Sequence, residues 1–533
     1  MSVYVYLDVS QKQEYIYKKN KLKDNLVRSF IVKATTEKLS DQHRDIEAIR
    51  TKLEGLLILE TYLNDNYSGL FEFEYSGGGN SIIRFTCLEK AKEFLENYSY
   101  EILNYYPDLE LYISIADEIA DKEILHNYEA SRIRELLISR SDQQKDSRKS
   151  RFKRWSYGIE EIDETGKAKL YGEETIETIY GNEIREFMLY DYKENLDEDR
   201  IKITTELNDY KKENGKSYIG VISIDGNRMG EIVEKIASFE DLRGFSKAIN
   251  NIYFIAIIKA LTEHASRKNN NQESTERLIV TPILQAGDDI CIIVEAEQAV
   301  DIAASILKSI NTLSQNNVAL MNKYLDNKYL TACAGVAIVK HGYPYFEAIK
   351  IAEKLCYEAK SSLYRPRTEK EGLQRQTLIS WEIVQSQVKE RIKFDSYSKY
   401  QNYELEYNIK PLCIDQELGL EDGIISYDAF IKITRDIAVG NTEDATFDSD
   451  DNKISNSFLE GIKQHMYGGI EQYCLYLDIN KKQTAKLEKI FENALNENIE
   501  YLLIDSEDNG RKKHTYLIND VIELLPFMKR GVE

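Results

Sequence analysis

Two adjacent aspartates, Asp288 and Asp289, follow a glycine between two apolar runs in the segment TPILQAGDDICIIVEA, residues 281–296. The apolar runs predict two strands joined by a tight turn, so both carboxylates are expected at the tip of a hairpin. Adjacent carboxylates repel each other, and their charged forms need a cation or hydrogen-bond donors beside them. A divalent cation is the usual compensation, although a Gly-Asp-Asp sequence also occurs in turns that have no chemical role.

A third carboxylate, Asp225, ends the apolar strand predicted in the segment IGVISID. If the hairpin pairs beside this strand, Asp225, Asp288 and Asp289 converge on one edge of the sheet, where hard oxygen ligands suit Mg²⁺ or Mn²⁺. Two such ions about 3.5–4 Å apart can activate a 3′-hydroxyl and stabilise the departing pyrophosphate. The three aspartates are therefore predicted as metal ligands and catalytic residues of nucleotidyl transfer. An aspartate at a strand end can instead cap the following helix.

Several residues near the carboxylates are suited to binding a triphosphate. Gly226, Gly230 and Gly287 would let the backbone approach the phosphates, and the segment DGNRMGEI places a strand end, a glycine turn and a helix start together. Lys360, at the end of the helix predicted up to EAKSS, is a candidate counter-charge for a phosphate. A single lysine on a helix is more often simply solvated.

The strands and helices expected around these residues occur twice along the chain. The first section contains a strand in SVYVYLDV, a hairpin in FEFEYSGGGNSIIRFTC and a closing strand in LELYISIAD, with helices between them. From Ser217 the same order of elements returns, again with a glycine-containing hairpin in the middle. This order predicts an α+β protein with an internal duplication.

Four sections are predicted, because one hydrophobic core does not serve 533 residues. Residues 1–117 and 208–365 are predicted as the two sheet domains. Residues 118–207 are predicted as a connecting domain, mainly helical or irregular, and residues 366–533 as a helical C-terminal domain.

The charge of the chain limits the partners that it can bind. A formal net charge of −21 disfavours non-specific nucleic-acid binding by the whole surface, because such binding neutralises phosphates with Lys and Arg. The segment from Arg140 to Arg154, RSDQQKDSRKSRFKR, is the exception, with seven basic residues in fifteen. It is either a solvated loop between domains or a patch for RNA or another acidic partner.

The termini, apolar runs and cysteines predict a cytoplasmic protein. The N-terminal segment MSVYVYLDVS has no basic region and is predicted to be a strand rather than a signal peptide. The longest apolar run, residues 252–258, is far short of the roughly 20 residues that span a bilayer. The six cysteines form no C-x-x-C pair, so neither a zinc ribbon nor a disulfide framework is expected.

The second section resembles the catalytic palm of the large polymerase-like subunit of type III CRISPR effector complexes, and more distantly GGDEF-type nucleotide cyclases. ISIDGNRMGEI resembles that subunit's D-G-D-x-M-G motif, and LQAGDDICIIV resembles its G-G-D-D hairpin. CAGVAIVKHGYPYFEAIKIAEKLCYEAKSS resembles the strand and helix that follow. The first section resembles the family's non-catalytic palm through LDVSQKQEYIYKKNKLKDNLVRSF and YSGGGNSIIRF, so the resemblance covers most of the chain.

The resemblance implies two ferredoxin-like palms that face each other and convert ATP into cyclic oligoadenylates during antiviral defence. Asp225, Asp288 and Asp289 would be the metal ligands, and Asn227 would lie near the nucleotide. The acceptor nucleotide would lie against the first hairpin, at Gly77, Gly78, Gly79 and Asn80. Effector-complex subunits are then expected partners through the segment from Arg140 to Arg154, and a homodimer is left open.

Departures from the family pattern leave two other functions open. The six histidines include no His-Asp pair of an HD nuclease, and the expected zinc-binding cysteines are absent, so a divergent relative is predicted. Ala286 replaces the hairpin's first glycine, and Asn227 replaces the motif's second aspartate. The alternatives are a palm-pair scaffold or nucleotide- or RNA-binding subunit of a defence complex, and a cyclic dinucleotide synthase that uses GTP.

Overall fold

The computed structural model describes most of the chain. The described residues are 2–528 except 18–20, 43–50, 119, 122–129, 150–172, 213–216, 271–276, 364–375, 385–396, 400–402, 416–419, 422–423, 440–453 and 509–510. Within these ranges, no helix has the length and apolar character needed to cross a membrane.

A four-stranded antiparallel sheet forms the first section, in the order β2-β3-β1-β4. Its strands are β1 (Val3–Val9), β2 (Phe71–Gly77), β3 (Asn80–Phe85) and β4 (Leu111–Asp117). Side chains alternate between its two faces, as the two-residue period of a strand requires. Val5 and Leu7 face a core shared with Phe30, whereas Tyr4 and Tyr6 pack with residues of the connecting section.

Helices cover both faces of this first sheet. One face packs against α2 (Leu22–Thr36), α4 (Leu59–Tyr67) and α5 (Leu88–Tyr105). The other face is covered by α6 (Ala130–Lys149), which places Ile133 and Leu137 against Tyr4 and Tyr6. Helix α6 therefore belongs to the first sheet structurally, although it follows the predicted end of that domain at residue 117.

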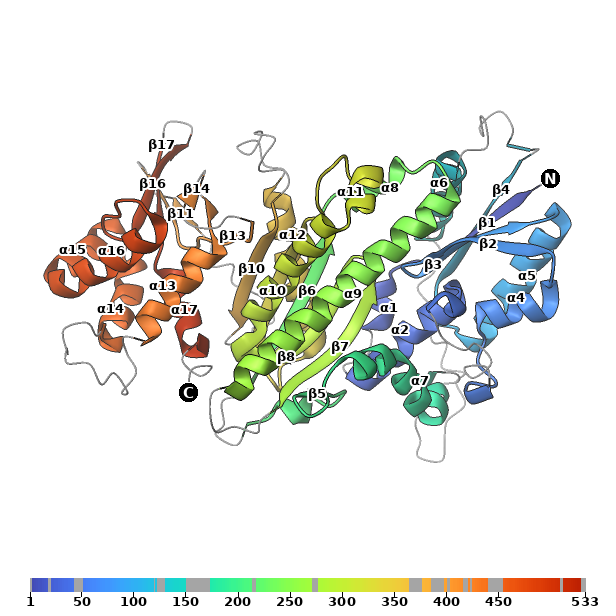
Figure 1. Ribbon diagram of the computed structural model, residues 1–533, viewed down its shortest axis with the longest axis horizontal. Helices are drawn as coiled ribbons and strands as arrows, with labels where there is room; N and C mark the ends of the chain where they lie inside the picture. The colour runs from blue at the N-terminus through green and yellow to red at the C-terminus, as the bar shows by residue number, and fades with distance from the viewer. Residues whose placement is uncertain are drawn as a thin grey trace.

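A seven-stranded mixed sheet forms the centre of the molecule, in the order β13-β10-β9-β6-β8-β7-β5 (Figure 1). Its strands are β5 (Ile201–Ile203), β6 (Tyr218–Gly226), β7 (Leu278–Ala286), β8 (Asp289–Glu295), β9 (Ala332–Lys340), β10 (Leu378–Val384) and β13 (Leu412–Cys413). The central part of this order, β7-β8-β6-β9, places a hairpin, a first strand and a last strand as β2-β3-β1-β4 does in the first sheet.

The two faces of the central sheet pack against different parts of the chain. Helices α9 (Phe239–Asn270) and α10 (Ala296–Asn316) cover one face, where Ile222 and Ile224 are buried. On the other face, Val221 and Ile293 share a core with α12 (Tyr345–Ser362) and with the helices of the first section. The first section thus packs directly on the central sheet, and the fold is α+β, as predicted.

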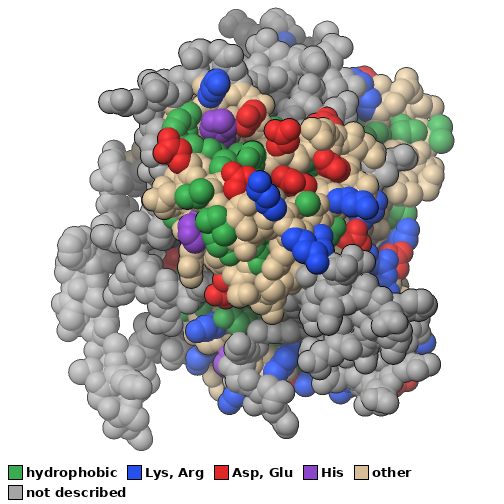
Figure 2. All heavy atoms as spheres, turned by 90° about the vertical axis from the view of Figure 1, so that its left-hand side faces the viewer, with side chains coloured by type: hydrophobic (Ala, Val, Ile, Leu, Met, Phe, Trp, Pro, Cys, Tyr) green, Lys and Arg blue, Asp and Glu red, His purple; other side chains and the backbone are tan. Residues whose placement is uncertain are grey.

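The C-terminal section contains a sheet as well as helices. Its helices are α13 (Tyr427–Val439), α14 (Asn456–Met466), α15 (Ile470–Ile479), α16 (Lys481–Leu495) and α17 (Asn519–Met528). A second four-stranded sheet has the order β11-β12-β17-β16, formed by β11 (Tyr397–Lys399), β12 (Tyr403–Glu406), β17 (Arg511–Tyr516) and β16 (Leu503–Asp508). The C-terminal section was predicted to be helical, but its described residues form both helices and a sheet. Figure 2 shows acidic, basic and hydrophobic side chains interspersed on this end of the molecule.

Strand β10 links the C-terminal section to the central sheet. It pairs in parallel with β9 along its whole length, from Leu378 opposite Cys333 to Val384 opposite Val339. Residue 365, the predicted end of the second sheet domain, therefore precedes a strand that continues the same sheet.

Candidate functional site

The two aspartates lie where the sequence predicts them, at the tip of the β7–β8 hairpin. Ala286 pairs with Asp289, so Gly287 and Asp288 form a two-residue turn. Gly287 has a φ of 67°, which glycine adopts without the steric cost that a side chain would bring. Strand β8 pairs with β6 up to Ile290 opposite Ile224, and this register brings Asp225 beside the tip. The structure thus brings all three predicted carboxylates together.

Mutual repulsion and burial make the carboxylate pair costly to ionise. Burial and, after it, the nearby charge of Asp225 together raise the pKa of Asp288 to about 6. Burial likewise raises the pKa of Asp289 to about 7, followed by the charges of Asp225 and Asp288. Groups of this kind bind a cation readily, because the cation removes the electrostatic cost of their charged forms.

Lys360 supplies a positive charge to this cluster. Its ammonium lies 2.6 Å from Oδ2 of Asp225 and donates to the carbonyl oxygen of Gly226 at 2.7 Å. Lys360 also lowers the pKa of both Asp288 and Asp289 through its charge. The sequence predicted this lysine as a phosphate counter-charge, and in the structure it is held by one of the predicted metal ligands.

The donor set fits a divalent cation chemically but is not arranged as a complete ligand shell. Among the residues that the structure describes, no three Asp, Glu, His or Cys side chains stand in metal-binding geometry. The carboxylates are nevertheless adjacent hard oxygen donors, and Asp288 is cradled by Gly226, where an added Cβ would lie 2.7 Å from its Oδ2. Asp225, Asp288 and Asp289 would hold the ion. Asp225 would then either leave its ion pair with Lys360 or contact Lys360 and the ion together.

The other predicted nucleotide contacts of the second section differ in their placement. Gly226 and Gly287 lie directly beside the carboxylates. Gly230 lies in α8 (Met229–Glu234) with open space where a side chain would be. The side chain of Asn227 is buried, and its Nδ2 donates to Thr331 Oγ1 at 3.1 Å and to the carbonyl oxygen of Gln376 at 3.2 Å. The side-chain amide of Asn227 therefore holds the end of β6 through these two hydrogen bonds.

Glu353 is a further acidic residue at the site that the sequence analysis missed. It lies on α12 seven residues before Lys360, so the two side chains share one face of the helix, two turns apart. Its charge raises the pKa of Asp289, and burial raises the pKa of Glu353 itself to about 7. The seven-residue spacing from Lys360 is the sequence signal that could have identified it.

Two buried tyrosines behind the hairpin were also missed. Tyr253 of α9 is fully buried. Burial raises the pKa of its hydroxyl, and the nearby charges of Asp288 and Asp225 also raise it. Tyr17, at the end of α1 (Lys12–Ile16), comes from the first section and is buried beside Cys291 of β8. Neither hydroxyl has a nitrogen or oxygen partner among the described residues. A single tyrosine in either segment carries no sequence signal for such a position.

The first hairpin also has a two-residue turn, but without the charges and with a positive φ at both turn residues, whereas in the second hairpin only Gly287 has one. Gly77 pairs with Asn80, and the two turn residues Gly78 and Gly79 have φ values of 63° and 74°. Two positive φ angles are the requirement of a type I′ turn, which only glycine and a few polar residues satisfy easily. An added Cβ on Gly77 would lie 3.4 Å from Ser246 Oγ of α9, so this hairpin lies against a helix of the second section.

Each section places a long helix against the hairpin of the other. Arg243 of α9 donates to the carbonyl oxygens of Phe73 and Glu74 in β2, both at 3.1 Å. In turn, Lys33 of α2 donates to the carbonyl oxygen of Gln285 in β7 at 3.4 Å. Each glycine-containing hairpin is thereby bonded to a helix of the other section.

Part of the predicted basic segment is engaged within the fold. Arg140 forms a two-pronged ion pair with Asp121, at 2.8 and 2.6 Å, and Lys145 pairs with Asp8 at 2.7 Å. Residues 150–154 and the side chains of the two residues before them lie outside the described residues. Because these ion pairs neutralise Arg140 and Lys145, the two residues contribute less positive charge to the surface than the sequence predicts.

Comparisons with known proteins agree on the central section. Residues 218–368 match the sequence model of the family described as Cas10/Cmr2, second palm domain. No curated protein matches the chain. Among solved structures, a Csm1-Csm4 cassette in complex with pppApApA aligns with a TM-score of 0.50 at 12% identity, over 99% of this chain and 69% of that chain.

Two further structures of the Csm1-Csm4 cassette resemble the chain less closely. The complex with cA4 has a TM-score of 0.49 at 11% identity, over 99% of this chain and 70% of that one. The complex with cA3 has a TM-score of 0.39 at 13% identity, over 68% of this chain, and the alignment spans only about half, 53%, of the matched chain. The carboxylate hairpin and Lys360 lie within the family match, and residues 218–368 are a second palm domain of the Cas10/Cmr2 type.

Proposed function

We propose that this chain is a metal-dependent nucleotidyltransferase that converts ATP into cyclic oligonucleotides with release of pyrophosphate, in CRISPR-type antiviral defence. One observation carries the proposal: Asp288 and Asp289 share a hairpin tip beside Asp225, inside a palm domain of the Cas10/Cmr2 type. A Csm1-Csm4 cassette in complex with pppApApA resembles the chain with a TM-score of 0.50, and the adenylate substrate that we propose is suggested by that complex.

Two facing palms related by internal duplication form part of this proposal. The shared strand order of the two sheets and the reciprocal contacts of α2 and α9 support it. The second palm would hold the donor triphosphate and the first, at Gly77, Gly78, Gly79 and Asn80, would hold the acceptor. Such an arrangement orients a 3′-hydroxyl toward an α-phosphate and so lowers the entropic cost of the reaction.

The residues of the second palm have separate roles in the proposed reaction. Asp225, Asp288 and Asp289 would hold Mg²⁺ or Mn²⁺, and the bound ions would activate the hydroxyl and stabilise the leaving pyrophosphate. Lys360 lies on the same edge as these carboxylates and would bind a phosphate oxygen of the donor. Gly287 leaves open space beside the carboxylates for a phosphate, whereas Gly226 makes room for the carboxylate of Asp288 itself.

A reaction with all four nucleoside triphosphates tests the proposal. The full chain is incubated with Mg²⁺ or Mn²⁺, pyrophosphate is measured, and the products are identified by mass spectrometry. Wild type should yield phosphatase-resistant adenylate products, and Asp288→Asn with Asp289→Asn should yield none. Glu347→Gln with Glu358→Gln removes the same charge from the exposed side of α12 and should remain active. Absence of product with every nucleotide and candidate activator contradicts the proposal, and GTP-derived products would favour a cyclic dinucleotide synthase.

A palm-pair scaffold is the second candidate function. The engagement of Asn227 by Thr331 and of Asp225 by Lys360 favours it, because both contacts remove groups from a metal-binding arrangement. Defence assays with Asp288→Ala and Asp289→Ala distinguish the two functions. Loss of protection supports the enzyme, and full protection supports the scaffold.

RNA or an effector-complex subunit is the partner that we propose for the basic segment. Csm1 is seen with Csm4 in a subcomplex of the type III-A Csm interference complex. Since Arg140 and Lys145 are paired internally, binding is expected to depend on the other five basic residues of the segment, which are Arg148, Lys149, Arg151, Lys153 and Arg154. Neutralising these five residues should reduce both RNA affinity and its salt dependence. Unchanged binding would exclude this segment as the contact.

A further inference from the structure

The first hairpin has a carboxylate at the position that Asp225 holds in the second. Asp8 of β1 pairs with Asn80, and Asn80 closes the turn as Asp289 does in the second hairpin. Gly79 and Asn80 therefore correspond to Asp288 and Asp289, and Asp8 corresponds to Asp225. Of the three carboxylates, the first palm retains only Asp8.

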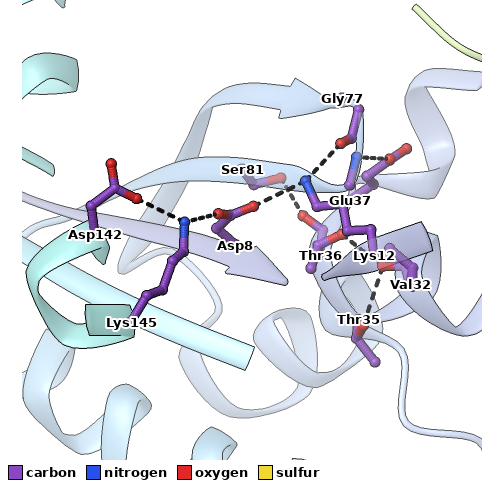
Figure 3. A network of polar contacts seen from close by, with 12 residues as sticks. Asp8, Lys12, Val32, Thr35, Thr36, Glu37, Gly77, Ser81, Asp142 and Lys145 are labelled. Atoms are coloured by element: carbon purple, nitrogen blue, oxygen red, sulfur yellow. Dashed lines mark hydrogen bonds and ion pairs between the residues drawn. The ribbon is translucent and has the colours of Figure 1, made fainter. Parts of the chain in front are cut away.

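Two lysines from different elements neutralise Asp8. Its side chain is only 10% exposed, and Oδ1 lies 2.9 Å from the ammonium of Lys12, whereas Oδ2 lies 2.7 Å from that of Lys145. Lys145 also pairs with Asp142 at 3.0 Å. Figure 3 shows Asp8 between the two lysines, Lys12 on the hairpin side and Lys145 on the side of α6. Together the two ammonium groups supply the charge of one divalent cation.

The same cluster holds the peptide group at the hairpin tip from both ends. Lys12 donates to the carbonyl oxygen of Gly78 at 3.0 Å, and the N–H of Gly79 donates to Oε1 of Glu37 at 2.6 Å. This carbonyl and this N–H belong to one peptide group. A cation and a carboxylate, both supplied by the chain, therefore fix the orientation of the tip (Figure 3).

We propose that Lys12 and Lys145 are built-in cations of the first palm: they take the place around Asp8 that a divalent ion would take around Asp225, and they hold the first hairpin without metal. The contrast with the second hairpin rests on the proposed function, in which the second palm holds the ions. Lys12 and Lys145 are positioning residues in this scheme. They shape the acceptor side of the site, which then keeps one geometry whether or not Mg²⁺ is bound.

Hydrogen exchange of the full chain tests this proposal, with peptides that cover residues 76–81 and 285–291. In wild type, Mn²⁺ should slow exchange in 285–291 and leave exchange in 76–81 within about two-fold of its rate in EDTA. Lys12→Met should speed exchange at 76–81 at least ten-fold, equally with Mn²⁺ and with EDTA. Lys145→Met should do so less strongly, because Lys145 acts only through Asp8. Lys145→Arg keeps the charge and should keep the protection.

Lys90→Met is the matched control, because Lys90 of the same section pairs with Glu93 on the exposed surface of α5. It should leave both peptides unchanged. The proposal is wrong if Mn²⁺ slows exchange in 76–81 and Asp8→Asn abolishes that effect, since the first palm would then bind metal. It is also wrong if both methionine variants fold and exchange as wild type does. If Mn²⁺ affects neither hairpin, the proposed function is contradicted, and the lysine variants still decide the present proposal.

Discussion

The ammonium of Lys360 lies 2.6 Å from Oδ2 of Asp225, so a charge of the chain itself occupies one of the three predicted metal ligands. The side chains of the pair are 24% and 45% exposed, which places the contact at the open edge of the site. An arriving cation or triphosphate therefore meets an ion pair that is accessible to exchange. Water screens such a pair, so its net contribution to stability is modest.

Lys360→Met is expected to weaken the metal-free protein more than the metal-bound one. Without Lys360, the three neighbouring carboxylates lose its counter-charge, and the loss of stability should be about 1–2 kcal/mol after allowance for solvent screening. Mg²⁺ should then raise the melting temperature more in the variant than in wild type, and product formation should fall at least ten-fold. Lys354→Met, which breaks the surface pair with Glu358, is the control for thermal unfolding in EDTA and Mg²⁺. An equal effect of Mg²⁺ on both proteins would exclude this role for Lys360.

The raised pKa values of Asp288 and Asp289 predict a pH-dependent stability. Folded values of about 6 and 7 exceed the unfolded value of about 3.9, so the folded state binds more protons between these limits. In EDTA, the free energy of unfolding should therefore fall as pH rises from about 4 to about 7. Urea unfolding at several pH values measures this slope, and Asp288→Asn with Asp289→Asn should flatten it. The same slope in both proteins would show that other groups cause it.

Metal binding should change with pH in the opposite sense. Only the deprotonated carboxylates coordinate a cation, so affinity for Mn²⁺ should increase over the same pH range with release of protons.

Gly226 and Gly230 offer a matched pair of substitutions. Gly226→Ala would place a Cβ 2.7 Å from Asp288 Oδ2 and from Met229 Cε, so the carboxylate must move. Activity and Mn²⁺ affinity should fall at least ten-fold, with little change in the melting temperature. Gly230→Ala meets nothing within 4 Å and lies in α8, so it should be neutral or stabilise by up to about 1 kcal/mol. Equal activity of both variants would contradict the claim that Gly226 makes room for the carboxylate of Asp288.

Tyr17 tests how the first palm supports the second. Its ring is buried beside Cys291, and its hydroxyl has no nitrogen or oxygen partner among the described residues. Tyr17→Phe removes a hydroxyl whose polar neighbour is the thiol of Cys291, a weak hydrogen-bonding group, and should change stability by less than about 1 kcal/mol. Tyr17→Ala should cost about 3–5 kcal/mol and loosen the contact between the palms. Chemical unfolding of both variants provides the measurement, and a costly Tyr17→Phe would reveal a hydrogen bond that matters.

The sequence was sufficient to predict both hairpins and to predict that Asp225 lies beside Asp288 and Asp289 of the second hairpin. Alternating apolar runs around Gly-Asp-Asp specify a tight turn, and the repeated order of elements places Asp225 beside it. Both signals are local or periodic, so they survive without knowledge of the tertiary contacts.

Contacts between distant segments could not be predicted. Lys145 and Asp8 are 137 residues apart, and Lys360 and Asp225 are 135 residues apart, so nothing in either neighbourhood indicates the pair. The C-terminal sheet was missed for a different reason. Its strands are short and charged, as in RKKHTY, and only their pairing distinguishes them from loops.

Strand β10 has a practical consequence for cutting the chain into fragments. A fragment that ends at residue 365 would lose β10 and expose the backbone donors and acceptors of β9 along ACAGVAIVK. That strand is buried except at its last residue, so its bare edge would be apolar and open to pairing with other molecules. A fragment that extends at least through Cys413 would keep β10 and β13 and leave the sheet with its native margin.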